Sequence, residues 1–421
     1  MFTIKSLTEA IKKFALPFNT PEDLAPLLRA IGDSRIVLLG EASHGTSEFY
    51  KVRAELSKRL IEEKGFTIIA VEGDWPSTQR VNRFIKGYDT DVNKQNVLNA
   101  FERWPTWMWA NEEIFELVKW LEKHNKHLED NRKIGFYGID VYSLWESLDE
   151  VIGYLRKTNP EGTDMAFAKK AISCFEPFNR HPETYAFSSI HISDACVEEV
   201  TKLVSSIRTN EKRYEDGQEA DLNLKINALV AKNAEEYYRA MVRSDELSWN
   251  VRDEHMVEAI NEVMDYHGKD TKVIVWAHNT HIGDASATDM KGEGLTNVGE
   301  ILRLQNKPEN VFSVGFGTHS GEVIAADEWG TIPKKMTVPP ARNDSWEDVL
   351  HRVKATDKIL IFNEENRTFF NKWIGHRAIG VVYNPDYEAY GNYVPSKIGS
   401  RYDAFIYIDK TNALSPIQVN E

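Results

Sequence analysis

Short apolar runs rich in β-branched residues recur along this chain of 421 residues and alternate with amphipathic segments. Residues 35–40 (RIVLLG) are apolar at successive positions, as is typical of a parallel strand that helices cover on both faces. In residues 47–64 the apolar positions recur every three or four residues, which predicts a helix. Strand and helix in alternation predict an α/β fold with a mixed, mostly parallel central sheet flanked by helices.

Strands are expected wherever such an apolar run occurs. These runs are residues 35–40, 67–71, 134–139, 273–277, 311–315, 359–362, 379–383 and 404–408. The last five lie close together along the chain, so antiparallel pairs are expected among them. Residues 318–322 (THSGE) combine polar side chains with Gly, which predicts a hairpin turn that joins residues 311–315 to a strand at residues 323–326.

Residues 144–268 contain amphipathic helical patterns and no apolar run of the strand type. A helical stretch of this length is far longer than an ordinary crossover connection. We therefore expect an all-helical lobe at 144–268, inserted into an α/β catalytic domain that is built from residues 1–143 and 269–421. The lobe and the domain are expected to form one compact molecule.

The charge balance argues against two classes of partner. Lys and Arg number 51 against 65 Asp and Glu, a net charge of −14, and both nucleic acids and anionic membranes are polyanions that such a chain repels. The sequence shows no signal-peptide pattern and no run of about 18 apolar residues, which predicts a cytoplasmic protein without a membrane segment. Two cysteines are too few for a disulfide framework or a cysteine zinc site, so Cys174 and Cys196 are predicted to be buried thiols.

Acidic and histidine side chains come directly after four of the predicted strands, where α/β sheets bind their ligands. They are Glu41 and His44 after the first strand, Glu72 after the second, Asp140 after the third, and His278 and His281 after the fourth. A histidine beside a carboxylate is suited to removing a proton from water. We predict that His44 is the general base and that Glu41 or Glu72 orients it. Arg53, two turns into the next helix, is predicted to pair with a site carboxylate or to stabilise developing negative charge.

The spacing of His278 and His281 leaves a second possibility open. Residues three apart on one turn can face a common ligand, and this spacing permits a divalent metal site together with Glu41, His44 or Glu72. The HExxH metal motif is absent from the sequence. We therefore expect no required metal, with a metal-dependent hydrolase at the same site as the alternative.

The motifs of two other enzyme classes are missing. The G-x-S-x-G elbow of serine hydrolases does not occur, and Ser43 lies one residue too far from Gly40 to match it. Neither the Walker A motif nor the G-x-G-x-x-G fingerprint occurs, since residues 292–297 depart from the latter at the last position. A serine nucleophile and a bound nucleotide are therefore not predicted.

Residues 104–109 contain three tryptophans, a local concentration of aromatic side chains. Such a cluster either packs in the core or forms an aromatic wall for a bulky apolar or sugar-bearing substrate. Arg103, next to the cluster, is suited to positioning a carboxylate or hydroxyl of that substrate. The predicted substrate-binding residues are Asp74, Trp75, Arg103, Trp104 and Trp107.

Four segments of the chain resemble signatures of the erythromycin esterase family, and they occur in the family's order. These are residues 40–49 (GEASHGTSEF) followed by Arg53, residues 72–75 (EGDW), residues 103–111 (RWPTWMWAN) and residues 276–282 (WAHNTHI). The resemblance implies an α/β catalytic domain with a helical lobe, a deep cleft, and hydrolysis of a macrolide lactone by water without an acyl-enzyme, a route to antibiotic resistance. By the same resemblance His44 would be the general base, with Glu41, Arg53 and Glu72 as supporting residues and His278 or His281 as a distal histidine.

The leading hypothesis is therefore an enzyme that hydrolyses a small-molecule ester or lactone through general-base activation of water at His44. A metal-dependent hydrolase and a binding protein that captures a small molecule without turnover are the alternatives. The sequence leaves the natural substrate and the oligomeric state open.

Overall fold

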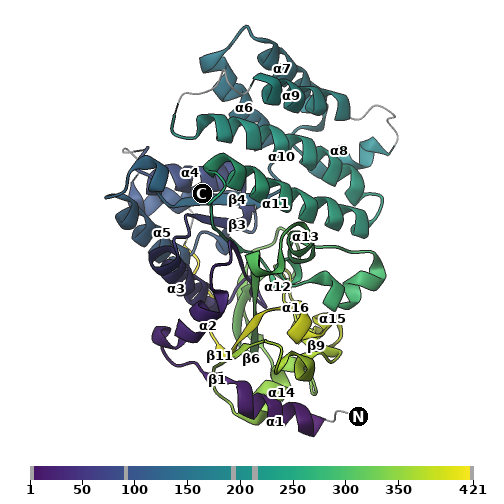
Figure 1. Cartoon of the computed structure of the whole chain (residues 1–421). Helices are drawn as coiled ribbons and strands as arrows, with labels where there is room; N and C mark the ends of the chain where they lie inside the picture. Colours follow the sequence, from purple (N-terminus) through teal and green to yellow (C-terminus); the bar gives the residue numbers. More distant parts are fainter. Residues whose placement is uncertain (1–3, 90–92, 191–195, 211–216, 418–421) are drawn as a thin grey trace. The chain divides into compact units, whose positions relative to one another are not determined.

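The computed structural model describes residues 4–89, 93–190, 196–210 and 217–417 (Figure 1). The chain divides into two units. The first consists of residues 1–69, 93–134 and 270–421, and the second of residues 70–92 and 135–269. The division falls inside strand β3 (Ile68–Asp74). The boundaries at 144 and 268 that the sequence suggests for a helical lobe stay a prediction.

The sheet of the first unit is built around β2 (Ile36–Leu39), which is buried along its whole length. It pairs in parallel with β5 (Val273–Trp276) on one side and with β6 (Val311–Ala325) on the other. Beyond β6 lies β11 (Ala404–Thr411), which is also parallel. Two more strands complete this edge: β8 (Lys358–Ile361) runs antiparallel to β11, and β1 (Leu16–Pro17) runs antiparallel to β8.

Strand β6 is much longer than the sequence suggests, and the hairpin turn predicted at residues 318–322 is wrong. The strand runs on for 15 residues, because its second half pairs with β11 as far as Gly321 and with the antiparallel strand β7 (Lys334–Val338) from Gly321 onward. Within this strand the polar Thr318 pairs with Ile408 of β11 and is 2% exposed. The connection that reverses the chain direction lies between Ala325 and Lys334 instead.

The strand predicted at residues 379–383 is also wrong. Only isolated bridges occur there, from Ile379 to Ser43 and from Val382 to Ala326. The sequence signal marks buried residues rather than a strand, since Ile379 and Tyr383 belong to a small apolar cluster with β6 and β7. A separate two-stranded antiparallel sheet, β9 (Ile374–Arg377) with β10 (Tyr393–Ser396), precedes and follows this segment.

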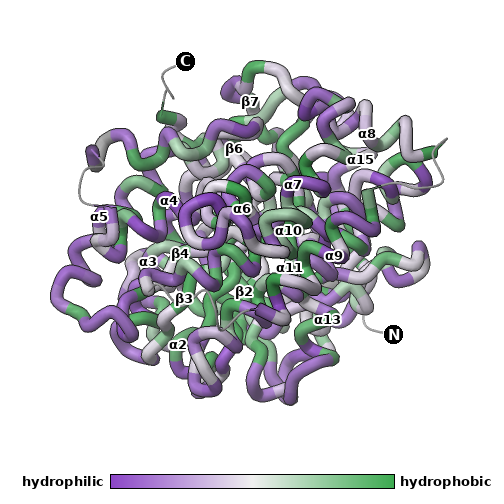
Figure 2. The backbone as a smooth tube through the Cα atoms, turned by 90° about the horizontal axis from the view of Figure 1, so that it is seen from above, coloured by the Kyte–Doolittle hydropathy of each residue, from purple (hydrophilic) through white to green (hydrophobic). Residues whose placement is uncertain are grey.

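Helices flank the sheet of the first unit. In Figure 2 strand β2 is coloured as hydrophobic, in keeping with a strand covered on both faces. The longest of these helices is α3 (Ser47–Lys64), whose bounds are those that the apolar spacing predicts. The other α-helices are α1 (Ile4–Phe14), α2 (Ala25–Ile31), α5 (Glu112–Asn125), α12 (Asn279–Ile282), α13 (Val298–Gln305), α14 (Trp346–Val353), α15 (Glu388–Gly391) and α16 (Ile398–Arg401).

The second unit is predominantly helical. Its two strands, most of β3 and the whole of β4 (Gly135–Asp140), lie next to each other. The helices are α4 (Trp75–Ile85), α6 (Leu144–Thr158), α7 (Thr163–Phe175), α8 (Pro182–Ser189), α9 (Val197–Asn210), α10 (Ala220–Met241) and α11 (Asp245–His267). Helices α6 to α10 pack around one apolar cluster that runs from Val141 to Tyr238.

The two cysteines lie at the edge of this cluster, and the prediction of two free thiols is wrong. Cys174 of α7 and Cys196, just before α9, form a disulfide. The sequence rule counts cysteines but carries no information on distance, whereas the helix packing brings the two Cα atoms within 5.8 Å. A cytoplasmic location stays a prediction.

The sheet is mixed, its central strands are parallel and helices flank it, which confirms the predicted α/β class. Within the described ranges no helix is both long enough and apolar enough to cross a membrane.

Candidate active site

The turn after β2 carries two of the predicted site residues. Glu41 is 1% exposed and His44 is 8% exposed, and Oε1 of Glu41 lies 2.9 Å from Nδ1 of His44. A carboxylate only accepts hydrogen bonds, so Nδ1 carries the proton and Nε2 carries the lone pair in the neutral ring. The structure thus pairs His44 with the carboxylate that the sequence places three residues before it.

Arg53 holds the other oxygen of the same carboxylate. Its Nη2 donates to Oε2 of Glu41, and its side chain is fully buried. The guanidinium lies between two aromatic rings, 4.4 Å from the ring centroid of Tyr50 and 4.6 Å from that of Trp276. Arg53 therefore compensates the buried charge of Glu41 and fixes its orientation toward His44.

Glycine allows the turn to pass close to β6. A Cβ atom on Gly45 would lie 1.9 Å from the carbonyl oxygen of Ile324, so only glycine fits. The Gly45 carbonyl accepts hydrogen bonds from the backbone N–H groups of Ile324 and Leu414. The turn that carries His44 is therefore fastened to the sheet directly after the histidine.

A second histidine lies beside His44. His278 is the N-cap of α12, and the centroid of its ring is 4.9 Å from that of His44. The Nδ1 atom of His278 lies 2.8 Å from Oγ1 of Thr280, whose hydroxyl can donate to it, and it accepts from the backbone N–H of Thr280 at 3.3 Å. Because a backbone N–H can only donate, Nδ1 is an acceptor and the proton of the neutral ring lies on Nε2. The two rings thus have opposite tautomers, with an acceptor Nε2 on His44 and a donor Nε2 on His278. His281 is buried on the same short helix.

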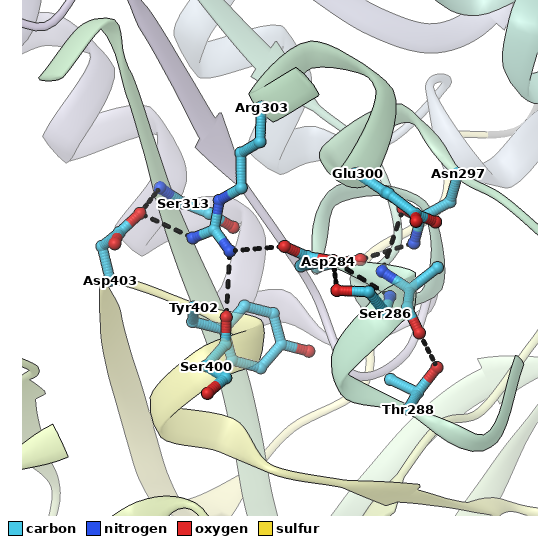
Figure 3. Close-up of polar contacts among 12 residues, drawn as sticks. Asp284, Ser286, Thr288, Asn297, Glu300, Arg303, Ser313, Ser400, Tyr402 and Asp403 are labelled. Carbon is cyan, nitrogen blue, oxygen red and sulfur yellow. Dashed lines mark hydrogen bonds and ion pairs between the residues drawn. The ribbon is translucent and has the colours of Figure 1, made fainter. Parts of the chain in front are cut away.

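Helix α13 holds the far end of this histidine turn (residues 278–283), and Figure 3 shows Arg303 of α13 bound to Asp284, the residue that follows the turn. The side-chain amide of Asn297 donates to the carbonyls of Thr280 and Gly283 at 2.7 and 2.5 Å. Arg303, two turns further along α13, binds Asp284 at 3.1 Å and Asp403, just before β11, at 2.8 Å. The turn is thereby tied to both α13 and the sheet.

Glu72 belongs to the second unit and is held by an arginine that the sequence analysis missed. Arg252 of α11 donates from Nη2 to Glu72 at 2.7 Å, and from Nε and Nη2 to the two oxygens of Asp140 at 2.9 and 2.7 Å. Burial lowers the pKa of Arg252, but the attraction of the two carboxylates outweighs it and raises that pKa well above its ordinary value. The helical spacing of the sequence could have indicated this residue, because Arg252 lies on the same face of α11 as Met256 and Ala259, which are buried. An arginine on a buried helix face needs a carboxylate partner.

Trp75 packs inside the second unit. Its ring stacks on Tyr137 at a centroid distance of 5.5 Å, and its Nε1 donates to Asn223 at 2.9 Å. Asp74 is the N-cap residue of the helix that Trp75 begins. A substrate-binding role for Asp74 and Trp75 stays a prediction.

The tryptophan cluster divides into buried and accessible members. Trp107 is 2% exposed, whereas Trp104 is half-buried and contacts Trp329 with ring centroids 4.5 Å apart. The Nε1 of Trp104 donates to the carbonyl of Thr331 at 2.9 Å, which uses its one polar atom within the protein. Arg103 is also partly exposed. Of the predicted aromatic wall, Trp104 is thus the member whose ring remains accessible.

Among the described residues no three His, Cys, Asp or Glu side chains come together in an arrangement that could hold a metal ion. A divalent metal held by Glu41, His44, Glu72, His278 or His281 stays a prediction. Both oxygens of Glu41 and Nδ1 of His44 have protein partners, whereas for Nε2 of His44 none is observed within the described part of the chain.

The profile of the erythromycin esterase family matches residues 61–411, most of the sequence. The chain belongs to the erythromycin esterase family. It is 23% identical to YbfO of Bacillus subtilis (strain 168), which carries a hydrolase name, over 95% of this chain and 90% of that protein. It is 25% identical to erythromycin esterase type II of Escherichia coli over 75% of this chain and 78% of that protein. Family and relatives together support hydrolase activity.

The fold is similar to that of a solved erythromycin esterase. A crystallised mutant of that enzyme in its open conformation superposes with a TM-score of 0.67 at 15% identity, covering 99% of this chain and 98% of the other. At this identity the likeness concerns the fold alone. The geometry of the histidines and their partners therefore rests on the residues of this chain.

Proposed function

We propose that this protein hydrolyses a carboxylic ester or lactone by general-base activation of water at His44. The observation that carries the proposal is the buried Glu41–His44 pair beside His278, whose rings present an acceptor and a donor Nε2. A base and an oxyanion donor side by side are what the addition of water to a carbonyl requires.

The reaction would proceed through one tetrahedral intermediate. Nε2 of His44 takes a proton from water as the water oxygen bonds to the carbonyl carbon. The carbonyl oxygen becomes negative and accepts a hydrogen bond from Nε2–H of His278. When the intermediate collapses, the bond from carbon to the alkoxy oxygen breaks and His44 returns its proton to that oxygen, which leaves as an alcohol.

Glu41 supports both proton transfers. It keeps the proton of the ring on Nδ1, so Nε2 remains available, and it stabilises the imidazolium that forms transiently. Arg53 holds the carboxylate in its orientation toward His44 by donating to its other oxygen. No covalent bond to the protein forms in this scheme, which agrees with the absence of a serine elbow from the sequence.

The substrate class that we propose is a macrolide lactone, because the Escherichia coli relative is named erythromycin esterase. The half-buried Trp104 beside Trp329 supports a substrate with a large apolar or sugar-bearing face. Simple lactones and aryl esters test the same hydrolysis on substrates that lack the large macrolide ring.

The test is mass-spectrometric detection of the addition of water, a gain of about 18 Da per bond opened by hydrolysis. The panel holds macrolides with 14- and 16-membered rings, simple lactones and p-nitrophenyl esters, each with wild type, His44→Ala and the exposed control His127→Ala. His44→Ala should lower kcat by about 10²–10⁴-fold, since that is the usual contribution of a general base, while His127→Ala should match wild type. Near-wild-type turnover by His44→Ala would refute the assignment. Loss of activity on chelation, with recovery on adding Zn²⁺ or Mn²⁺, would favour the metal-dependent alternative.

A further inference from the structure

Asn279, the first residue of α12, lies between the two histidine-bearing segments. Its side chain is fully buried, although it follows His278 directly in a polar sequence. Its backbone N–H donates to the carbonyl of Glu41 at 2.9 Å. This hydrogen bond joins the turn of Glu41 and His44 to the histidine turn.

The amide side chain of Asn279 completes the edge of β6 where β2 ends. The last hydrogen bond along the line of β2 runs from the N–H of Gly40 to the carbonyl of Val314. Two residues further along β6, Phe316 meets Asn279 instead: Nδ2 donates to the Phe316 carbonyl at 2.7 Å, and Oδ1 accepts from its N–H at 3.2 Å. The amide thus replaces the peptide group of a strand that has turned away.

Gly40 makes room for this amide. A Cβ atom on residue 40 would lie 2.1 Å from Oδ1 of Asn279, closer than any real contact. The glycine that ends β2 and the asparagine that begins α12 are therefore fitted to each other.

His376 and Arg401 hold Asn279 from its other sides. Nε2 of His376 lies 3.2 Å from Nδ2 of Asn279, and Nδ1 of His376 lies 2.5 Å from Glu347. The amide nitrogen of Asn279 can only donate, so Nε2 of His376 accepts from it and the proton of the ring lies on Nδ1, facing Glu347. Arg401 donates to the carbonyl of Asn279 at 3.0 Å. These partners fix the orientation of the amide.

We infer that Asn279 is a positioning residue that sets the separation of the His44 and His278 rings. It touches neither the base nor the oxyanion, and it acts by clasping Phe316 with its side chain while its backbone holds Glu41. The inference rests on the proposed function, because it assigns a purpose to the 4.9 Å spacing of the two rings.

The matched control is Asn125, which uses the same chemistry elsewhere in the first unit. Nδ2 of Asn125 donates to the carbonyl of Ile134 at 2.9 Å, and Oδ1 accepts from the N–H of Ile134 at 2.7 Å. It is as buried as Asn279 and likewise clasps both groups of a single peptide unit. Asn125→Ala and Asn279→Ala thus each remove a pair of hydrogen bonds to one peptide unit, and Asn279→Ala also removes the contact with His376.

The experiment compares crystal structures and steady-state kinetics of wild type, Asn279→Ala and Asn125→Ala. Asn279→Ala should move the two ring centroids apart by about 1 Å and lower kcat on the best p-nitrophenyl ester or macrolide by about 10–100-fold, as misplacement of this size does in other active sites. Its KM should change less than about threefold, since the loss affects the chemical step rather than binding. Asn125→Ala should keep both the ring spacing and kcat. An unchanged ring separation in Asn279→Ala, or an equal loss of kcat in both variants, would overturn the inference.

Gly40→Ala supplies a second route to the same answer should Asn279→Ala fail to fold. The added methyl pushes on Oδ1 of Asn279, so this variant alone should also lower kcat by about 10-fold or more. Combined with Asn279→Ala it should add less than about threefold, because the clash has been removed. Full additivity in the double variant would contradict a common cause.

These results separate the inference from the proposed function. If His44→Ala abolishes turnover while Asn279→Ala is unaffected in structure and rate, the function stands and the inference fails. If His44→Ala keeps its activity, the proposed function fails, and the ring separations in the crystal structures still decide whether Asn279 sets the spacing.

Discussion

Each unit of the molecule buries an arginine against carboxylates at the ends of its strands, but the numbers of charges differ. In the first unit Arg53 faces one carboxylate, Glu41. In the second unit Arg252 faces two, Glu72 and Asp140. Counting formal charges with histidine neutral, the first group sums to zero and the second to −1.

The two guanidinium groups also differ in their surroundings, since Arg252 makes more hydrogen bonds than Arg53. Arg53 lies between Tyr50 and Trp276, and its Nε and Nη1 atoms have no hydrogen-bond partner among the described residues. Arg252 uses Nε and Nη2 on Asp140 and Nη2 again on Glu72, with Tyr142 as its aromatic neighbour at 5.0 Å. In the pair of one arginine and one carboxylate, Arg53 binds one oxygen of Glu41 and the other oxygen orients His44. In the group of one arginine and two carboxylates, Arg252 is bound by Glu72 and Asp140 and compensates their charge. We infer that the first arrangement is built for orientation and the second for holding two acidic groups together.

Removing Arg252 should have the largest effect. Arg252→Met leaves two buried carboxylates without their cation, so the stability of the second unit should fall by about 5 kcal/mol, the upper end for a broken buried pair. Hydrogen-exchange protection of peptides from β3, β4 and α11 reports this loss in the unit itself. If Glu72→Gln alone rescued Arg252→Met as fully as Glu72→Gln together with Asp140→Asn, the description as one arginine with two carboxylates would be wrong.

Removing Arg53 should cost less, about 3 kcal/mol, because one buried carboxylate loses its partner. A single second change, Glu41→Gln, should restore most of this stability by removing the uncompensated charge. Activity should not return, since the amide cannot stabilise an imidazolium at His44. Urea unfolding together with ester turnover of the single and double variants measures both quantities, and a double variant as unstable as Arg53→Met would break the comparison.

The sequence predicts the group around Arg53 far better than the group around Arg252. Glu41, His44 and Arg53 lie within thirteen consecutive residues that span a strand end and a helix with a clear apolar spacing, so local patterns suffice. Arg252 meets Glu72 across 180 positions of sequence, and no periodicity reports a contact of that range. The same reason hides the clasp of Asn279 on Phe316 and the pairing of Cys174 with Cys196, both of which depend on packing between distant segments.

The strands likewise divide into those that local composition predicts and those that depend on distant partners. Runs that are buried on both faces, such as β2 and β5, are found from their composition alone. The continuity of β6 through residues 318–322 is missed because this segment contains Thr, His, Ser and Gly, the residues of a turn. It remains a strand because β11 and β7 satisfy its backbone, and a single sequence carries no record of such partners.

The smallest effect is expected from pH. Burial lowers the pKa of His255, one turn after Arg252, to about 4, against about 6.5 in an unfolded chain. The unfolded chain therefore takes up a proton as the pH falls below 6.5 while the folded one does not, so stability is lost on acidification. By linkage the second unit should lose about 2 kcal/mol from His255 between pH 7 and pH 5.

The check is the pH dependence of unfolding in His255→Gln, which should be shallower than in wild type between pH 7 and pH 5. The exposed His181 of the same unit provides the control, and His181→Gln should leave the slope unchanged. A His255→Gln slope equal to that of wild type would show that other groups account for the acid sensitivity.

The length of β6 limits how relatives of this chain can change during evolution. One strand bonds to β2, β11 and β7 in succession and also donates to Gly45 beside the histidine. Inserting or deleting a single residue within it would turn every later side chain to the opposite face and shift the register of three neighbours at once. Length variation among descendants should therefore accumulate in the segment between Ala325 and Lys334, where a longer connection leaves the ladder intact. Such changes leave the pairing of β6 with its neighbours, and its hydrogen bond to Gly45 beside His44, unaltered.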